Sequence, residues 1–214
     1  MHNGTCIGID VGAEAKGFHA VALLGKDVER LHTTNTHEVL RWCVERKPCA
    51  IGVDAPCRWR GGRERAAERE MRQDSISCFP TPSEDGARRT PFHAWMVNGA
   101  ALYEALEKDF PLFDGQARGE ICFETYPQAI ACALAGRALS ATRKRFERKV
   151  LLERAGIKTA ALTGIDYVDA ALCALTARHL VAGSYKTYGD RESGFIVVPK
   201  VEAKKPPFLR RYKL

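Results

Sequence analysis

Three short apolar segments of this chain each end in an acidic residue, and this pattern most constrains its fold. The segments are CIGID, CAIGVD and ICFE, and their acids are Asp10, Asp54 and Glu124. Short runs rich in Ile, Val and Phe are typical of strands buried in a sheet. A carboxylate at the end of such a strand has no obvious packing role. The pattern therefore raises the hypothesis that these acids carry chemistry.

The order of apolar segments predicts an α/β fold. Three strands should form a meander, and a helix over 36–46 should lead to a fourth strand parallel to the first. With the strand that ends at Glu124, we expect a five-stranded mixed sheet flanked by helices. The expected strands are 5–11, 17–24, 27–33, 49–54 and 119–125, with GFIVVP at 194–199 as a short final strand.

Residues 57–118 interrupt this alternation. They contain a charged helix, a Pro-rich loop and a longer helix, with too few apolar residues for a separate core. We therefore expect a helical insertion after the fourth strand, one domain over residues 1–199, and a basic tail over 200–214. Further helices are predicted over 127–136, 142–156 and 164–183.

The net charge of +7 is unevenly distributed. Residues 58–72 carry +3, and residues 137–149 and 200–214 carry +5 each, which leaves −6 for the rest of the chain. A basic rim around an acidic centre is typical of a protein that binds a polyanion. Three solvated faces explain the charge equally well.

Two compositional features bear on location. No apolar run approaches the roughly 20 residues that a membrane span needs, and the N-terminus does not resemble a signal peptide. The 8 cysteines include no CxxC pair, so buried thiols in a reducing cytoplasm are expected rather than a disulfide framework or a zinc site. We therefore expect a cytoplasmic protein with no membrane partner.

The last predicted helix carries two more acids. Asp166 and Asp169 are three residues apart and share one face of its first turn. Helix capping is an adequate explanation for Asp166. It explains Asp169 less well, because the apolar AALCALTA that follows must pack on the sheet and so directs Asp169 toward the sheet edge.

The strand-end acids could share a metal ion. Asp10 and Asp54 would lie at equivalent ends of neighbouring parallel strands, which are about 4.8 Å apart. Carboxylates that close repel one another unless a divalent cation neutralises them, and oxygen ligands favour Mg²⁺ or Mn²⁺. Two such ions about 4 Å apart are the usual arrangement for hydrolysis of a phosphodiester. Each acid alone could instead be a turn or capping residue.

The strand order, together with the positions of Asp10, Asp54 and Asp169, resembles the ribonuclease H-like fold. The DYVDA motif is similar to that of RuvC-type Holliday junction resolvases. GIDVG, VDAP, RERAAEREMR, FPTP, FETYP, DYVDA and ESGFIVVP together resemble domain-of-unknown-function family 429, a family of predicted RNase H-like nucleases. The resemblance extends from about Thr5 to Pro199.

This resemblance implies a metal-dependent nuclease that uses two Mg²⁺ or Mn²⁺ ions on DNA or RNA. Asp10 would bridge the ions, Asp54 would complete one site, and Asp169 would close the other with help from Asp166. Glu124 would bind metal or orient water. Because RuvC-type enzymes place a glutamate on the fourth strand, where this chain has Asp54, either Asp54 or Glu124 could be the second metal ligand from a strand. Phosphate would be held by Arg65, Arg72, Lys144 and Arg148.

Three other functions stay open. An ATP-using enzyme of the actin and sugar-kinase type has a similar first loop, but it needs two such cores and a second glycine-rich phosphate loop. A non-catalytic nucleic-acid-binding module would use the same basic segments, and carboxylates dispersed or each paired with Arg would favour it. The same chemistry could also act on a small phosphate ester.

Overall fold

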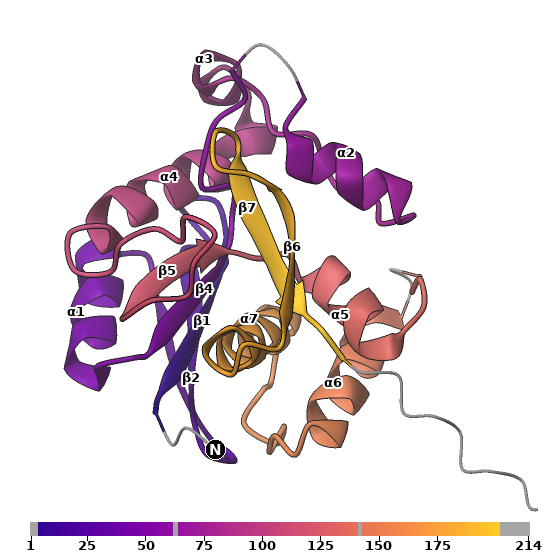
Figure 1. Ribbon diagram of the computed structural model, residues 1–214. Coiled ribbons are helices and arrows are strands. Elements are labelled where there is room, and N and C mark those ends of the chain that lie inside the picture. Colours follow the sequence, from indigo (N-terminus) through magenta and orange to yellow (C-terminus); the bar gives the residue numbers. More distant parts are fainter. Residues whose placement is uncertain (1–3, 62–63, 141–142, 202–214) are drawn as a thin grey trace, which may run out of the picture.

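The computed structural model describes residues 4–61, 64–140 and 143–201, which form one mixed sheet with helices on both faces (Figure 1). The strand order across the sheet is β3-β2-β1-β4-β5-β7-β6. The strands are β1 (Cys6–Val11), β2 (Phe18–Leu24), β3 (Asp27–Thr33), β4 (Ala50–Asp54), β5 (Ile121–Glu124), β6 (Tyr185–Asp190) and β7 (Gly194–Pro199). Most of the predicted tail, from residue 202, lies outside the described residues.

The first five strands confirm the predicted topology. β1 pairs antiparallel with β2, and β2 with β3, so the chain begins with a meander. β4 is parallel to β1, and β5 is parallel to β4. A meander followed by parallel strands on the far side of β1 is the arrangement of the ribonuclease H-like fold.

The predicted strand count of five was wrong, because the described sheet has seven strands. β7 is the predicted GFIVVP segment, and it joins the sheet parallel to β5. The sequence YKTYGD of β6 lacks an apolar run, so its pattern does not predict a strand. It is an edge strand held by antiparallel pairing with β7, which tertiary context supplies.

The longer helices fall at the predicted places, whereas the short α3 (Glu84–Arg88) and η1 (Pro91–His93) lie where the Pro-rich loop was predicted. After α1 (Thr36–Arg46), the segment between β4 and β5 holds α2 (Ala66–Gln73), α3, η1 and α4 (Ala94–Leu106). After β5 come α5 (Pro127–Ala135), α6 (Lys144–Arg154) and α7 (Ile165–Val181). Among the described residues, no helix has the length and apolar character needed to cross a membrane.

Two glycines bring α7 directly onto the centre of the sheet. A Cβ atom at Gly8 of β1 would lie 2.0 Å from the carbonyl oxygen of Ala170, and one at Gly52 of β4 would lie 2.7 Å from that of Cys173. Only a residue without a side chain permits this approach. α7 therefore covers the face to which Gly8 and Gly52 belong.

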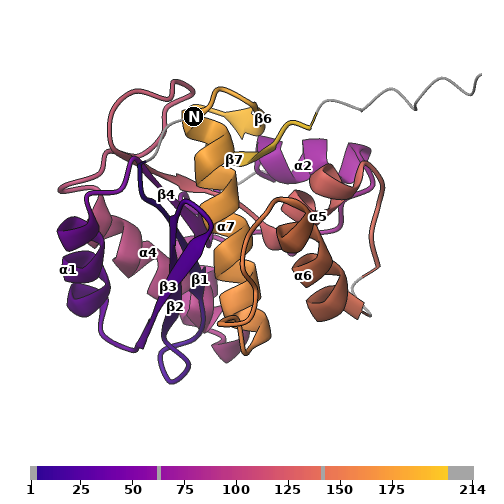
Figure 2. The same cartoon turned by 90° about the horizontal axis from the view of Figure 1, so that it is seen from below.

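The opposite face is covered by α1 and α4, as Figure 2 shows. Because side chains alternate along a strand, Ile7, Ile9, Ile51 and Val53 point to this second face. They pack there with Leu102 and Leu106 of α4 in one buried cluster. Even-numbered positions of β1 and β4 therefore face α7, and odd-numbered positions face α4.

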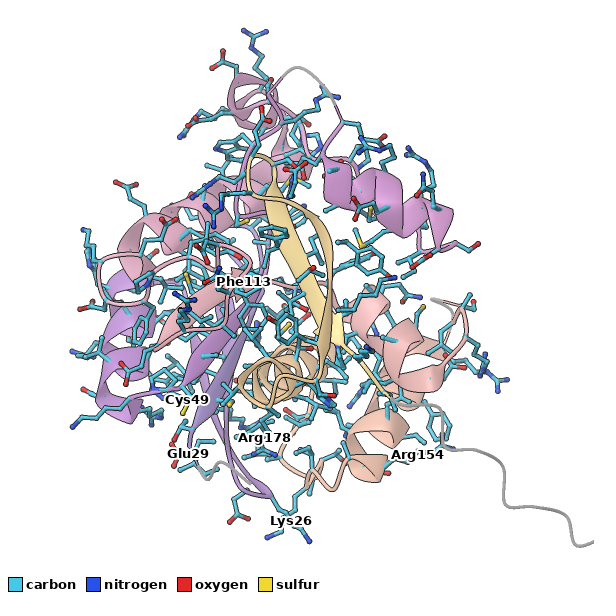
Figure 3. The ribbon with its side chains drawn as sticks, viewed as in Figure 1. Lys26, Glu29, Cys49, Phe113, Arg154 and Arg178 are labelled. Atoms are coloured by element: carbon cyan, nitrogen blue, oxygen red, sulfur yellow. The ribbon has the colours of Figure 1, made fainter. Side chains whose placement is uncertain are left out.

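The strand ends that begin β1 and β4 lie far from the acids. Figure 3 labels Cys49, Lys26 and Arg178 near this end of the sheet. Cys49 precedes β4, and Arg178 in the last turn of α7 bonds to the carbonyl oxygen of Gly25. The predicted acids follow at the other, carboxyl ends of the same strands.

Candidate metal centre

Asp10 and Asp54 face each other across the parallel pair of β1 and β4. They are direct partners in the register, so both side chains lie on the α7 face of the sheet. The Asp10 side chain is 9% exposed, and among the described residues its Oδ2 has no hydrogen-bond partner. A buried carboxylate oxygen without a partner is unfavourable unless a proton or cation satisfies it.

Asp169 reaches the same place from α7. The close contact of α7 with Gly8 and Gly52 brings the first turns of the helix to the carboxyl ends of β1 and β4. Asp169 is buried, and its Oδ1 accepts a hydrogen bond from Nη1 of Arg148 at 2.5 Å. Arg148 therefore supplies part of the positive charge that Asp169 needs to be buried.

The pKa values of the three carboxyl groups show that they affect one another. Burial, followed by the negative charge of Asp169, raises the pKa of Asp10 to about 7. Burial, followed by the charges of Asp10 and Asp169, raises the pKa of Asp54 well above its usual range. Burial also raises the pKa of Asp169, against the lowering effect of Arg148. Among the described residues, the group of three potential ligands whose atoms lie within 4.8 Å of one another is Asp10, His19 and Asp166, so a metal site that includes Asp54 and Asp169 stays a prediction.

Glu124 lies on the other face of the sheet. Its partner in the register is Val53 rather than Asp54, so it points away from α7. Arg65 holds it with two hydrogen bonds, Nη1 to Oε1 at 3.0 Å and Nη2 to Oε2 at 2.5 Å, and the backbone N–H of Cys57 adds a third at 2.8 Å. Glu124 therefore anchors the start of the segment between β4 and β5, and it also lines the same pocket as Asp54.

The predicted phosphate-binding residues fall into two groups. Arg65 is 2% exposed and Arg148 is 6% exposed, and each is held by a buried carboxylate. Phosphate binding by these two residues stays a prediction, and it would require a phosphate to displace the carboxylate that each guanidinium binds. Arg72, which pairs with Glu64, and Lys144 of α6 are exposed.

Asp166 lies close to Lys16 and His19, which the sequence did not predict as site residues. Its Oδ1 accepts a hydrogen bond from Nζ of Lys16 at 2.7 Å, and that Nζ is 4.0 Å from Oδ2 of Asp10. His19 of β2 is the register partner of Asp10 on its other side, and its Nε2 lies 4.0 Å from Oδ2 of Asp166. Asp10, His19 and Asp166 each place a ligand atom within 4.8 Å of the others.

A signal for His19 was present in the sequence. β1 and β2 are joined by a short turn with Gly12 and Gly17, whose backbones pair at 2.8 Å. A tight turn fixes the register of a hairpin, so the residue two positions after Gly17 is placed opposite Asp10. Lys16 belongs to the same turn.

The residues present fit a divalent cation. Asp10 and Asp54 are register partners on one face of the sheet, and among the described residues neither forms an ion pair with an arginine. Such a donor set suits Mg²⁺ or Mn²⁺. The negative charge of Asp169 is already neutralised by its ion pair with Arg148. The ammonium group of Lys16 lies where a second ion, bound by both Asp10 and Asp166, would lie.

The fold and this cluster define a ribonuclease H-like protein with a carboxylate-rich candidate metal centre. The chain belongs to the family described as Protein of unknown function (DUF429), whose family model matches residues 8–193. Among solved structures, Thermus thermophilus RuvC is similar at 18% identity, over 84% of this chain and 96% of RuvC, with a TM-score of 0.43. Comparison with curated proteins found no match.

Proposed function

We propose that this protein is a metal-dependent nuclease that hydrolyses phosphodiester bonds in DNA or RNA. The observation that carries the proposal is the pairing of Asp10 with Asp54 on the face of the sheet that α7 covers. A protein that only binds nucleic acid gains nothing from neighbouring carboxylates that repel one another. Binding of a cation would explain why these carboxylates lie together.

The residues would divide the work as follows. Asp10 and Asp54 would hold Mg²⁺ or Mn²⁺, with Asp169 adjacent. Glu124 lines the same pocket as Asp54, but Arg65 binds both of its carboxylate oxygens, so Glu124 is not assigned as a ligand. A bound divalent ion lowers the pKa of a water ligand and neutralises charge on the phosphate. Arg148 keeps the Asp169 carboxylate in place through its 2.5 Å hydrogen bond. Lys16 and Lys144, which are both accessible to solvent, are the basic side chains available to phosphate.

The insertion supplies a pocket next to the candidate centre. Asp54 lines this pocket together with aromatic side chains from the insertion and from the end of β5, namely Phe79, Trp95 and Tyr126. Apolar walls beside a polar reacting centre are typical of a site that binds an organic substrate. Segments inserted into a rigid scaffold usually set specificity, so the choice of substrate is assigned to residues 57–118.

The test is cleavage of labelled nucleic acids. Single-stranded, duplex and branched DNA and RNA are incubated with Mg²⁺ or Mn²⁺, and with a chelator. We expect metal-dependent cleavage that is lost in Asp10→Asn and kept in Asp109→Asn, a matched change at an exposed acid. Cleavage that persists in Asp10→Asn would overturn the assignment.

A separate arm addresses the non-catalytic alternative. Nucleic-acid binding is measured for the same two variants under conditions that do not allow cleavage. Tight binding with no cleavage of any substrate would favour a binding module. Hydrolysis of a small phosphodiester alone, with no cleavage of polymers, would instead restrict the activity to small esters.

A further inference from the structure

One row of residues crosses four strands on the face that α7 covers. His32 of β3, His19 of β2, Asp10 of β1 and Asp54 of β4 are successive register partners. Partners in register lie on the same face, so this row brings imidazole nitrogens next to the candidate centre. Asp166 of α7 lies over the row, close to His19.

The ligand atoms of Asp10, His19 and Asp166 are spaced for one cation. They lie within 4.8 Å of one another, and His19 Nε2 is 4.0 Å from Asp166 Oδ2. Two donors on opposite sides of an ion, each at about 2.1 Å, are about 4.2 Å apart. Only a small movement of side chains would bring the three donors to bonding distance.

Two atoms of this group are buried without a partner among the described residues. They are Oδ2 of Asp10 and Nδ1 of His19. The His19 ring is held in place by stacking on His32, with ring centroids 4.3 Å apart, and by the edge of Tyr167 at 4.9 Å. A fixed imidazole beside an unsatisfied buried carboxylate is an arrangement that a metal ion would complete.

A cationic side chain lies beside these donors in the structure. Nζ of Lys16 is 2.7 Å from Oδ1 of Asp166 and 4.0 Å from Oδ2 of Asp10. The Lys16 side chain is 50% exposed and extends from a turn, so it can move into solvent. A divalent ion among the same carboxylates would take over the neutralising role of its ammonium group.

We propose that Asp10, His19 and Asp166 form a metal site of mixed nitrogen and oxygen donors, and that Lys16 leaves it when the metal binds. Imidazole favours first-row transition ions, whereas Mg²⁺ prefers oxygen donors alone. The site therefore selects Mn²⁺ over Mg²⁺. The proposal rests on the proposed function only in sharing Asp10, and it concerns binding rather than cleavage.

The first test is spectroscopic and uses the full-length protein with Mn²⁺. Pulsed electron paramagnetic resonance of bound Mn²⁺ detects a directly bound ¹⁴N nucleus. We expect a nitrogen signal in the wild-type protein, its loss in His19→Phe, which keeps an aromatic ring, and its retention in His37→Gln, at an exposed histidine of α1. Bound Mn²⁺ without a nitrogen signal in the wild-type protein would overturn the proposal without using a variant.

The second test measures affinity by calorimetry for Mn²⁺ and Mg²⁺ separately. We expect His19→Phe to weaken Mn²⁺ binding about tenfold or more and to change Mg²⁺ binding much less. Lys16→Met should strengthen Mn²⁺ binding about two- to fivefold by removing the competing charge. Weaker Mn²⁺ binding in Lys16→Met, or equal losses for both metals in His19→Phe, would contradict the proposal.

These outcomes are separable from the nuclease assignment. Mn²⁺ bound without nitrogen, together with metal-dependent cleavage, would remove His19 from the site and leave the nuclease in place. A nitrogen signal without cleavage of any substrate would keep the metal site and remove the nuclease. No Mn²⁺ binding by the wild-type protein would overturn the metal site whatever the cleavage assay gives.

Discussion

Asp10 and Asp54 are direct register partners across the parallel strands β1 and β4, and both carboxyl groups lie under α7. The charge of Asp10 adds to burial in raising the pKa of Asp54, and the charge of Asp169 adds to burial in raising the pKa of Asp10. In the metal-free protein this pair opposes folding when both groups are charged. The arrangement is thus a source of instability that cation binding would relieve.

The first prediction concerns stability and pH. The pKa of Asp10 is about 7 in the folded protein, above its unfolded value of about 4, so the folded state holds the extra proton between these values. The free energy of unfolding should therefore fall as pH rises from about 4 to 7. Asp10→Asn should flatten part of this slope and stabilise the metal-free protein at pH 8 by roughly 2–4 kcal/mol.

Urea unfolding at pH 5, 6, 7 and 8 in the presence of a chelator measures this effect. Asp109→Asn, at an exposed acid, serves as the control and should leave the pH dependence unchanged. An Asp10→Asn protein that is less stable than wild type at pH 8 would contradict the burial and repulsion assigned to Asp10.

The second prediction concerns metal affinity and pH. Metal binding requires ionised carboxylates, and Asp10 carries a proton below about pH 7. Mn²⁺ affinity should therefore rise up to about tenfold per pH unit below 7 and level off above it. Calorimetry across pH 5.5–8.5 measures the change, and a flat profile would show that Asp10 is not a ligand.

The third prediction separates Asp54 from Glu124. Glu124→Gln removes the carboxylate that forms two hydrogen bonds with the buried Arg65 and leaves it only the more distant Glu68, at 3.8 Å. It should therefore destabilise the protein by roughly 2–4 kcal/mol, with metal affinity unchanged. Asp54→Asn should do the reverse, weakening metal binding without loss of stability, because it removes a repelling charge. Loss of metal affinity in Glu124→Gln, measured beside urea unfolding, would restore Glu124 as a ligand.

The fourth prediction concerns Arg148. Arg148→Ala removes the cation that accompanies buried Asp169 and should lower the free energy of unfolding by roughly 3–5 kcal/mol at pH 8. The loss should become smaller as the pH falls, because burial raises the pKa of Asp169 and a protonated Asp169 does not need the cation. Arg72→Ala, whose exposed side chain pairs with Glu64, is the matched control and should cost less than about 1 kcal/mol.

The fifth prediction concerns the contact that positions α7. Gly8→Ala would place a methyl group 2.0 Å from the Ala170 carbonyl and 2.2 Å from the Ala174 nitrogen, so α7 must shift. We expect a loss of stability of about 3 kcal/mol or more and weaker metal binding, because Asp166 and Asp169 move with the helix. In Gly61→Ala the added methyl group meets nothing within 4 Å, so stability in thermal unfolding and metal affinity in calorimetry should both equal those of the wild-type protein within error.

Local sequence patterns determined much of the fold. Apolar runs ending in Asp10 and Asp54 predict neighbouring parallel strands, and DYVDA predicts a helix whose acids approach them; both features are present. These inferences succeed because strand and helix periodicity are local and because parallel strands align their carboxyl ends. β6 was not predicted, because its sequence has no apolar run and its formation depends on pairing with β7.

Which acids face the cluster was decided only by tertiary structure. Asp54 and Glu124 both end buried strands, and one residue of register places them on opposite faces of the sheet. Partner choice also depends on the fold: Arg65 and Arg148 look like phosphate ligands in a basic sequence, but burial pairs them with Glu124 and Asp169. Register and burial arise from contacts between distant segments. The sequence by itself therefore determined that acids gather at the strand ends, and the fold determined which of them share a site.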